Sequence, residues 1–186
     1  MNPTVLNDKK VIGSEGFILG EVEGVNVDLN TWRASLLYVR LSDEAAAGLG
    51  LKRSFSKTTI CLPINFVKSV GDVITLNEPL HNLENVAANQ CFVNPTKLKG
   101  KKVIGAKGHN VGEIESLDLE PRNWQITGIQ VSLTNEAATE LGCKPPFLSR
   151  VVISIPTKIV KSVGNMINLN EDIQDFKALV KCLQYS

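Results

Sequence analysis

The sequence contains the same unit twice. Lys-Lys-Val-Ile-Gly at residues 9–13 recurs at 101–105, and Val-Lys-Ser-Val-Gly at residues 67–71 recurs at 160–164. The copies align at an offset of 92 residues, which becomes 93 after one inserted residue. This repeat is longer than a solenoid unit of about 20–50 residues and fits a small folded domain. We therefore predict two domains, residues 1–93 and 94–186.

The composition excludes several classes of protein. The chain is 43% hydrophobic and 21% charged, as is usual for a globular protein. Its 20 Lys and Arg residues balance 19 Asp and Glu residues, which argues against binding of nucleic acid through the phosphate backbone. The apolar runs are too short to span a membrane, and the first residues lack the layout of a signal peptide. We expect a cytoplasmic protein without direct membrane insertion.

Each copy is predicted to contain about five short strands. A glycine-rich turn follows the first strand, and the next residues nearly alternate between apolar and polar, as in a half-buried strand. Turn residues and a tryptophan, Trp32 or Trp124, precede the third strand. Each tryptophan either packs on the hairpin or anchors a partner, and we favour packing. The expected strands are 10–12, 21–28, 34–41, 60–63 and 72–76, with counterparts 102–104, 113–119, 126–133, 153–156 and 165–169.

Two helices are predicted in each copy. A short internal helix begins after Ser42 or Thr134, which suit the N-cap, and ends at Gly50 or Gly142. A C-terminal amphipathic helix is indicated by apolar residues on one helical face. In the first copy these are Leu80, Leu83, Val86 and Ala87; in the second they are Ile173, Phe176, Leu179, Val180 and Leu183. The fold class is therefore mainly β, as two tandem small barrels, because closure leaves few exposed strand edges.

The ordered pattern resembles the PRC-barrel domain. The resemblance rests on Val-Ile-Gly, then Gly-Glu-Val-Glu or Gly-Glu-Ile-Glu, and the closing segments 60–76 and 153–169. Each closing segment joins a strand-ending proline to Val-Lys-Ser-Val-Gly. The resemblance covers both copies and implies a tandem PRC-barrel protein.

Proteins made of two such barrels and little else include archaeal cell-division proteins of the CdpB type, to which this chain is similar. That resemblance implies a non-enzymatic protein–protein adaptor without a cofactor. It would link SepF, and through it FtsZ, to a second PRC-barrel protein, as a homodimer or heterodimer recruited to midcell. PRC-barrels also occur in a ribosome-maturation factor, so an RNA- or ribosome-associated maturation module is the alternative. A small-ligand-binding barrel is a third possibility.

No set of residues in the sequence indicates catalysis. His81 and His109 lie in different copies, and neither aligns with another histidine. None of the four cysteines is duplicated, which predicts free thiols in a reducing cytoplasm; they are Cys61, Cys91, Cys143 and Cys182.

One duplicated pair of carboxylates shares a face of the second strand. Glu21 and Glu23 alternate along the first copy, as do Glu113 and Glu115 along the second. Two carboxylates could serve acid–base chemistry. On a small barrel we favour a solvated outer face.

The copies differ most between the internal helix and the fourth strand. This loop combines basic and aromatic residues, and we favour partner binding there over RNA binding and over a plain loop without a binding role. The candidates are Lys52, Arg53, Phe55, Lys57, Pro146, Phe147, Leu148 and Arg150. For self-association we predict the apolar helix face of Ile173, Phe176, Leu179, Val180 and Leu183.

Overall fold

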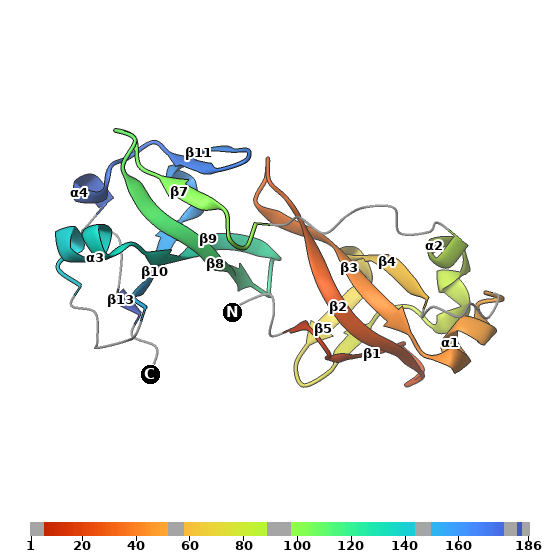
Figure 1. Ribbon diagram of the computed structural model, residues 1–186. Coiled ribbons are helices and arrows are strands. Elements are labelled where there is room, and N and C mark those ends of the chain that lie inside the picture. Colours follow the sequence, from red (N-terminus) through yellow and green to blue (C-terminus); the bar gives the residue numbers. More distant parts are fainter. Residues whose placement is uncertain (1–5, 52–57, 89–97, 144–149, 177–181, 184–186) are drawn as a thin grey trace. The chain divides into compact units, whose positions relative to one another are not determined.

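The computed structural model describes residues 6–51, 58–88, 98–143, 150–176 and 182–183 (Figure 1). The chain divides into two compact units, which we call the first domain (residues 3–96) and the second domain (residues 97–120 and 125–186). The predicted boundary between residues 93 and 94 lies outside the described residues.

The first domain is built on one twisted sheet. Its spatial order is β4-β3-β2-β1-β6-β5, and every pair is antiparallel except β1 with β6, which is parallel. Figure 1 shows β2 and β3 as the long hairpin of this sheet. The strands are β1 (Lys10–Ile12), β2 (Ile18–Asp28), β3 (Arg33–Leu41), β4 (Thr59–Pro63), β5 (Val67–Val70) and β6 (Ile74–Leu76).

The second domain repeats this order and adds a strand. Its sequence of pairs is β13-β10-β9-β8-β7-β12-β11, again with one parallel pair, β7 with β12. The strands are β7 (Lys102–Ile104), β8 (Asn110–Glu120), β9 (Gln125–Leu133), β10 (Val152–Pro156), β11 (Val160–Val163), β12 (Ile167–Leu169) and β13 (Cys182–Leu183).

The mainly β prediction is confirmed, and the strand count is corrected. The segment Val-Lys-Ser-Val, which lies outside the five predicted strands, forms a further strand in each domain, β5 and β11. Pairing among the described strands leaves β4 and β5 at the two ends of the first sheet. The described residues therefore form a curled sheet in each domain, and closure into a barrel is not confirmed.

The internal helices form as predicted. The helix α1 (Asp43–Gly48) begins where Ser42 Oγ accepts the N–H of Ala45, and α3 (Asn135–Leu141) begins where Thr134 Oγ1 accepts the N–H of Ala137. These hydrogen bonds satisfy donors that the first helical turn leaves free. Gly142 ends α3 in the left-handed conformation, with φ of 74°.

The C-terminal helix is confirmed only for the first domain. There a 3₁₀ turn, η3 (Leu80–Leu83), runs into α2 (Glu84–Ala88). In the second domain the structure describes α4 over Ile173–Phe176, and Leu183 lies in β13, paired with Val152 of β10. The predicted helix through Leu183 is wrong because β10 offers an open edge, and pairing with an edge overrides local periodicity. Short 3₁₀ turns also follow the strand-ending prolines: η2 (Ile64–Phe66) and η4 (Thr157–Ile159).

Equivalent positions of the repeat form the two cores. The inward-facing side chains are fully or almost fully buried, and each such aliphatic side chain contributes roughly 1.5–3 kcal/mol to stability. In the first domain they include Val11, Leu19, Val22, Leu37, Val39, Ile60, Leu62, Ile74 and Leu76. In the second they include Val103, Val111, Ile114, Ile129, Val131, Ile153, Ile155, Ile167 and Leu169.

The prediction of free cysteines is wrong for Cys61 and Cys143. Both are disulfide-bonded, and no free cysteine is found within the described residues. Disulfide formation depends on proximity in the fold, which the spacing of four unduplicated cysteines does not reveal. Cys91 lies outside the described residues, and Cys182 is described by its backbone alone.

Candidate functional site

Both domains carry a hollow at the same place. In the first domain it has a volume of about 300 Å³ and lies between β1, the start of β2 and the junction of β3 with α1. In the second it has a volume of about 340 Å³ and lies at the equivalent part of β8 and β9. The first is lined by Lys10, Ile18, Gly20, Glu21, Arg40, Leu41, Ser42 and Asp43. The second is lined by Asn110, Gly112, Glu113, Ser132, Leu133, Thr134, Asn135 and Arg150.

A glycine sets the backbone frame of each hollow. A Cβ atom on Gly20 would overlap the carbonyl of Arg40, and one on Gly112 would overlap the carbonyl of Ser132. No side chain fits between strands that approach this closely, so each position requires glycine. The helix cap, Ser42 or Thr134, completes the frame on the other side.

In the first domain an arginine clamps the duplicated carboxylates. Arg40 donates from Nη2 to Glu21 Oε2 at 2.7 Å and from Nη1 to Glu23 Oε1 at 3.2 Å. Thr59 donates to the second oxygen of Glu23 at 2.8 Å. The hydrogen bond to Glu21 raises the pKa of Arg40. The two glutamates thus share one face, as predicted, and they serve as ion-pair partners.

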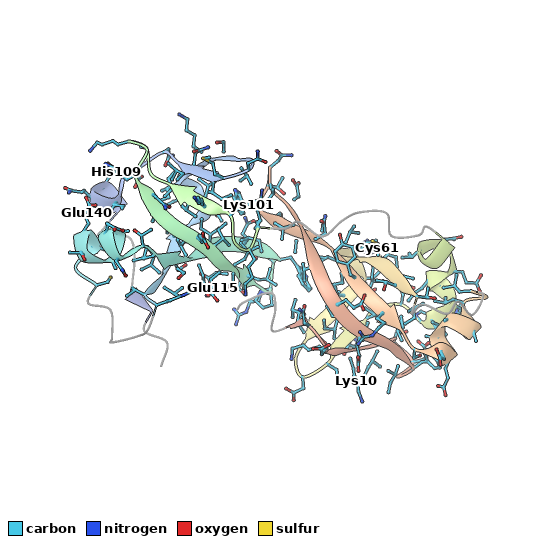
Figure 2. The ribbon with its side chains drawn as sticks, viewed as in Figure 1. Lys10, Cys61, Lys101, His109, Glu115 and Glu140 are labelled. Carbon is cyan, nitrogen blue, oxygen red and sulfur yellow. The ribbon has the colours of Figure 1, made fainter. Side chains whose placement is uncertain are left out.

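The second domain keeps the carboxylates and lacks the arginine. Glu113 pairs with Ser132 in the β8–β9 ladder, as Glu21 pairs with Arg40 in the β2–β3 ladder. Glu113 is exposed and Glu115 is half-buried, and neither makes an ion pair with any residue that the structure describes. Figure 2 labels Glu115 on β8.

The apolar character of the hollow also differs. Ile18 is 47% exposed and is one of two large exposed hydrophobic side chains in the described part of the chain. Asn110 occupies its position in the second domain. The first hollow therefore presents an aliphatic side chain beside charged groups, whereas the second presents amide and hydroxyl groups beside Glu113 and Arg150.

Farther along the same face, the second domain holds a polar network. Gln130, 8% exposed, donates to Asp118 Oδ1 at 2.7 Å and accepts from Ser116 at 2.6 Å. Ser154 donates to the other oxygen of Asp118 at 2.5 Å. Because these groups hydrogen-bond to one another, this partly buried network is a stable part of the face.

The first domain has an aromatic side chain where the network lies. Tyr38 takes the position of Gln130 and is 5% exposed. Its hydroxyl has no hydrogen-bond partner among the described residues. Gly24 opposes Tyr38 in the ladder and leaves space for the ring. Alignment of the two copies did not single out the exchange of Tyr38 for Gln130, because it lies within a strand that both copies retain.

At the glycine-turn end, each domain places a carboxylate from a different segment: the turn between β1 and β2 in the first, and the residues between β12 and α4 in the second. In the first, Glu15 accepts the N–H of Leu80 at 2.8 Å, and this hydrogen bond lowers the pKa of Glu15. In the second, the Asp172 side chain is 3% exposed and lies 3.4 Å from Lys107 Nζ and 3.3 Å from His109 Nδ1. Burial opposes ionisation of Asp172, but the N–H of Ile173 and the neighbouring Lys107 and His109 side chains outweigh it, so the pKa of Asp172 is lowered.

The two histidines lie in different surroundings. His109 is 57% exposed beside Asp172, and His81 is exposed in η3. Across the described residues no group of three His, Cys, Asp or Glu side chains could hold a metal ion. No described helix is long and apolar enough to cross a membrane.

Most of the loop residues predicted to bind partners lie outside the described residues. Arg150 is described; it is exposed and lines the hollow of the second domain. The seven others are Lys52, Arg53, Phe55, Lys57, Pro146, Phe147 and Leu148. One predicted residue therefore joins the duplicated hollow, and the sequence prediction missed the strand residues that line the rest of it.

The predicted self-association face is not assembled on one helix. Ile173 is 2% exposed, so its side chain belongs to the core of the second domain. Phe176 is the last residue of α4, and Leu183 lies in β13. Leu179 and Val180 lie outside the described residues.

Comparison with known proteins identifies a domain in the second half. Residues 92–174 match the family model of the PRC-barrel domain, so the chain carries a PRC-barrel domain over these residues. No curated protein matches the chain.

Proposed function

We propose that the chain is a non-enzymatic protein–protein adaptor whose two domains hold different partners. The observation that carries the proposal is the duplicated hollow, which has the same backbone frame in both domains and a different lining. A conserved frame with divergent side chains suits two binding specificities on one scaffold.

We propose further that the first domain is a second PRC-barrel domain. Its six strands follow the same order as the repeat strands of the second domain, including the single parallel pair. The bulge after Val22 in β2 has its counterpart after Ile114 in β8. The two domains share their strand order, their strand register and the position of the bulge. These shared features support two tandem PRC-barrel domains more strongly than the repeated sequence segments alone.

The chemistry of the two hollows supports different partners. In the first, exposed Ile18 suits an apolar anchor, and Lys10 and Asp43 also line the hollow. In the second, Asn110 and Asn135 offer hydrogen bonds beside Glu113, which has no ion-pair partner among the described residues. A partner side chain that fits one hollow would leave polar groups without hydrogen bonds in the other. Each hollow would therefore discriminate between the two partners.

For the cellular role we propose the archaeal cell-division machinery, following the resemblance to CdpB-type proteins. The partners would be SepF, and through it FtsZ, and a second PRC-barrel protein, with recruitment to midcell. Assembly as a homodimer or heterodimer stays a prediction, which the mass of the protein in solution tests.

The test is affinity capture from native cells with matched variants in the full chain. Ile18→Asp places a charge in the first hollow, and Asn110→Asp makes the equivalent change in the second. We expect each variant to lose a different protein while retaining the other. Recovery of SepF, FtsZ or another PRC-barrel protein supports the cell-division assignment.

Two outcomes would refute the adaptor. One is that both variants retain or lose the same proteins. The other is recovery of ribosomal subunits alone, with binding that weakens steeply as salt rises, because release of counterions from nucleic acid gives that dependence.

A further inference from the structure

We propose that Glu113 and Glu115 of the second domain bind an arginine side chain of a partner protein, in the place that Arg40 fills within the first domain. This inference rests on the proposed adaptor function and names the chemistry that one hollow recognises. The evidence is a comparison of the two domains with each other.

In the first domain the equivalent pair of glutamates binds an arginine side chain. The guanidinium of Arg40 uses two nitrogens, one toward each glutamate, at 2.7 and 3.2 Å. Arginine suits such a pair because its donors are fixed in a planar fork. The Arg40 side chain is only 26% exposed, so the contact is partly shielded from water.

The second domain reproduces the acceptors at equivalent backbone positions. The ladder pairs Glu113 with Ser132, where the first domain pairs Glu21 with Arg40. The register then shifts at the same point in both strands, at the position of Glu23 or Glu115. The two carboxylates of the second domain therefore project from the same places as their counterparts.

Among the described residues no basic side chain forms an ion pair with these acceptors, including Lys102 of β7, which lies opposite Glu113 in the β7–β8 ladder. The segments β8, β9 and β10 contain no lysine or arginine. Ser132 is too short to replace Arg40, and Val152 takes the place of Thr59. Arg150 lines the hollow, yet no ion pair links it to either carboxylate in the described residues.

The hollow favours an arginine over a metal ion. It provides about 340 Å³ directly beside Glu113. The described residues offer no third acidic, cysteine or histidine ligand there. Ser132 and Asn110 line the same hollow and suit the remaining donors of a guanidinium.

The experiment titrates the full-length protein with N-acetyl-arginine amide and follows backbone amide signals by NMR. We expect shifts centred on residues 112–116 and 132, with affinity in the millimolar range because the pair is solvent-exposed. The isosteric but neutral citrulline amide should give none. Exchanging both glutamates for glutamine, E113Q with E115Q, should weaken binding about tenfold.

Two reciprocal variants test the equivalence of the domains. Ser132→Arg should fill the site from within, abolish the shifts and leave thermal stability at least as high. Arg40→Ser should empty the first domain's site and create a second set of shifts around Glu21 and Glu23. Equal shifts with citrulline amide, shifts that persist in S132R, or no shifts at residues 112–116 would each overturn the proposal.

The same variants separate this inference from the adaptor function. If arginine amide binds as expected and the capture experiment fails, the site stands and the adaptor proposal falls. If capture succeeds, while S132R retains every partner and arginine amide does not bind, the adaptor stands and the arginine site falls.

Discussion

Replacement of Gly112 by alanine tests the geometry on which the hollow depends. Gly112 pairs with Val103 on one side and with Leu133 on the other, so it lies in the middle of three strands. An added Cβ would overlap the Ser132 carbonyl and lie 2.9 Å from its carbon and 3.0 Å from Leu133 Cα. These are backbone atoms, so relief requires the strands to separate.

The expected cost follows from these contacts. Overpacking of a buried site costs about 1–3 kcal/mol, and each weakened ladder hydrogen bond adds about 1 kcal/mol. We expect Gly112→Ala to destabilise the second domain by about 3–4 kcal/mol. The matched control is Gly108→Ala in the turn, where φ is +84° and nothing lies within 4 Å of an added Cβ. The control should cost only about 1–2 kcal/mol, from the left-handed backbone.

The assay is urea unfolding followed by hydrogen exchange of the β8 and β9 amides, which reports the second domain by itself. The equivalent variant of the first domain, Gly20→Ala, should show a similar loss in β2 and β3. If G112A costs no more than G108A, the close approach of the strands does not require glycine, and our account of the frame is wrong.

Three further changes have defined outcomes. Tyr38→Phe should raise the free energy of unfolding of the first domain by about 1 kcal/mol in chemical denaturation, because it removes a buried unpaired hydroxyl; a loss would show that the hydroxyl has a partner. Asp172→Asn should make the free energy of unfolding fall less steeply as pH is lowered into the acid range. The folded pKa of Asp172 lies below its ordinary value of 3.8, so its contribution is complete above that value and is lost as pH falls through the lower folded pKa; identical acid limbs for wild type and D172N would contradict this. Reduction with dithiothreitol should destabilise the protein by about 2–4 kcal/mol per disulfide lost, seen as a lower Tm, because Cys61 and Cys143 are disulfide-bonded; an unchanged Tm under full reduction would refute this prediction.

Local signals in the sequence predicted the elements that depend on neighbouring residues. The N-caps Ser42 and Thr134 bond to amides three residues ahead, and Gly142 needs only its own left-handed φ. The alternation of Glu21 and Glu23 placed both carboxylates on one face. All of these features are set within a few residues of chain, so a single sequence is enough to predict them.

Features that depend on distant residues were missed or wrong. The segment at Leu183 has apolar spacing that suits a helix, yet it pairs as a strand with β10, about 30 residues away in sequence. The disulfide bonds of Cys61 and Cys143 likewise depend on proximity in the fold. The candidate loops were predicted because the two copies differ there at several consecutive residues. The residues of the hollow that differ between the copies are instead spaced along strands that both copies retain.

The sequence by itself determined the repeat, the mainly β class, most strands and the internal helices, because each depends on periodicity, capping or turn chemistry within a short segment. Only the tertiary structure decided which residues meet: Arg40 reaches Glu21 across a ladder 19 residues apart in sequence, and Gly20 lets the strands approach closely enough for that contact. The physical reason is that strand register and bulges fix side-chain neighbours. With the register known, the exchange of Arg40 for Ser132 becomes a difference in what each domain is equipped to bind.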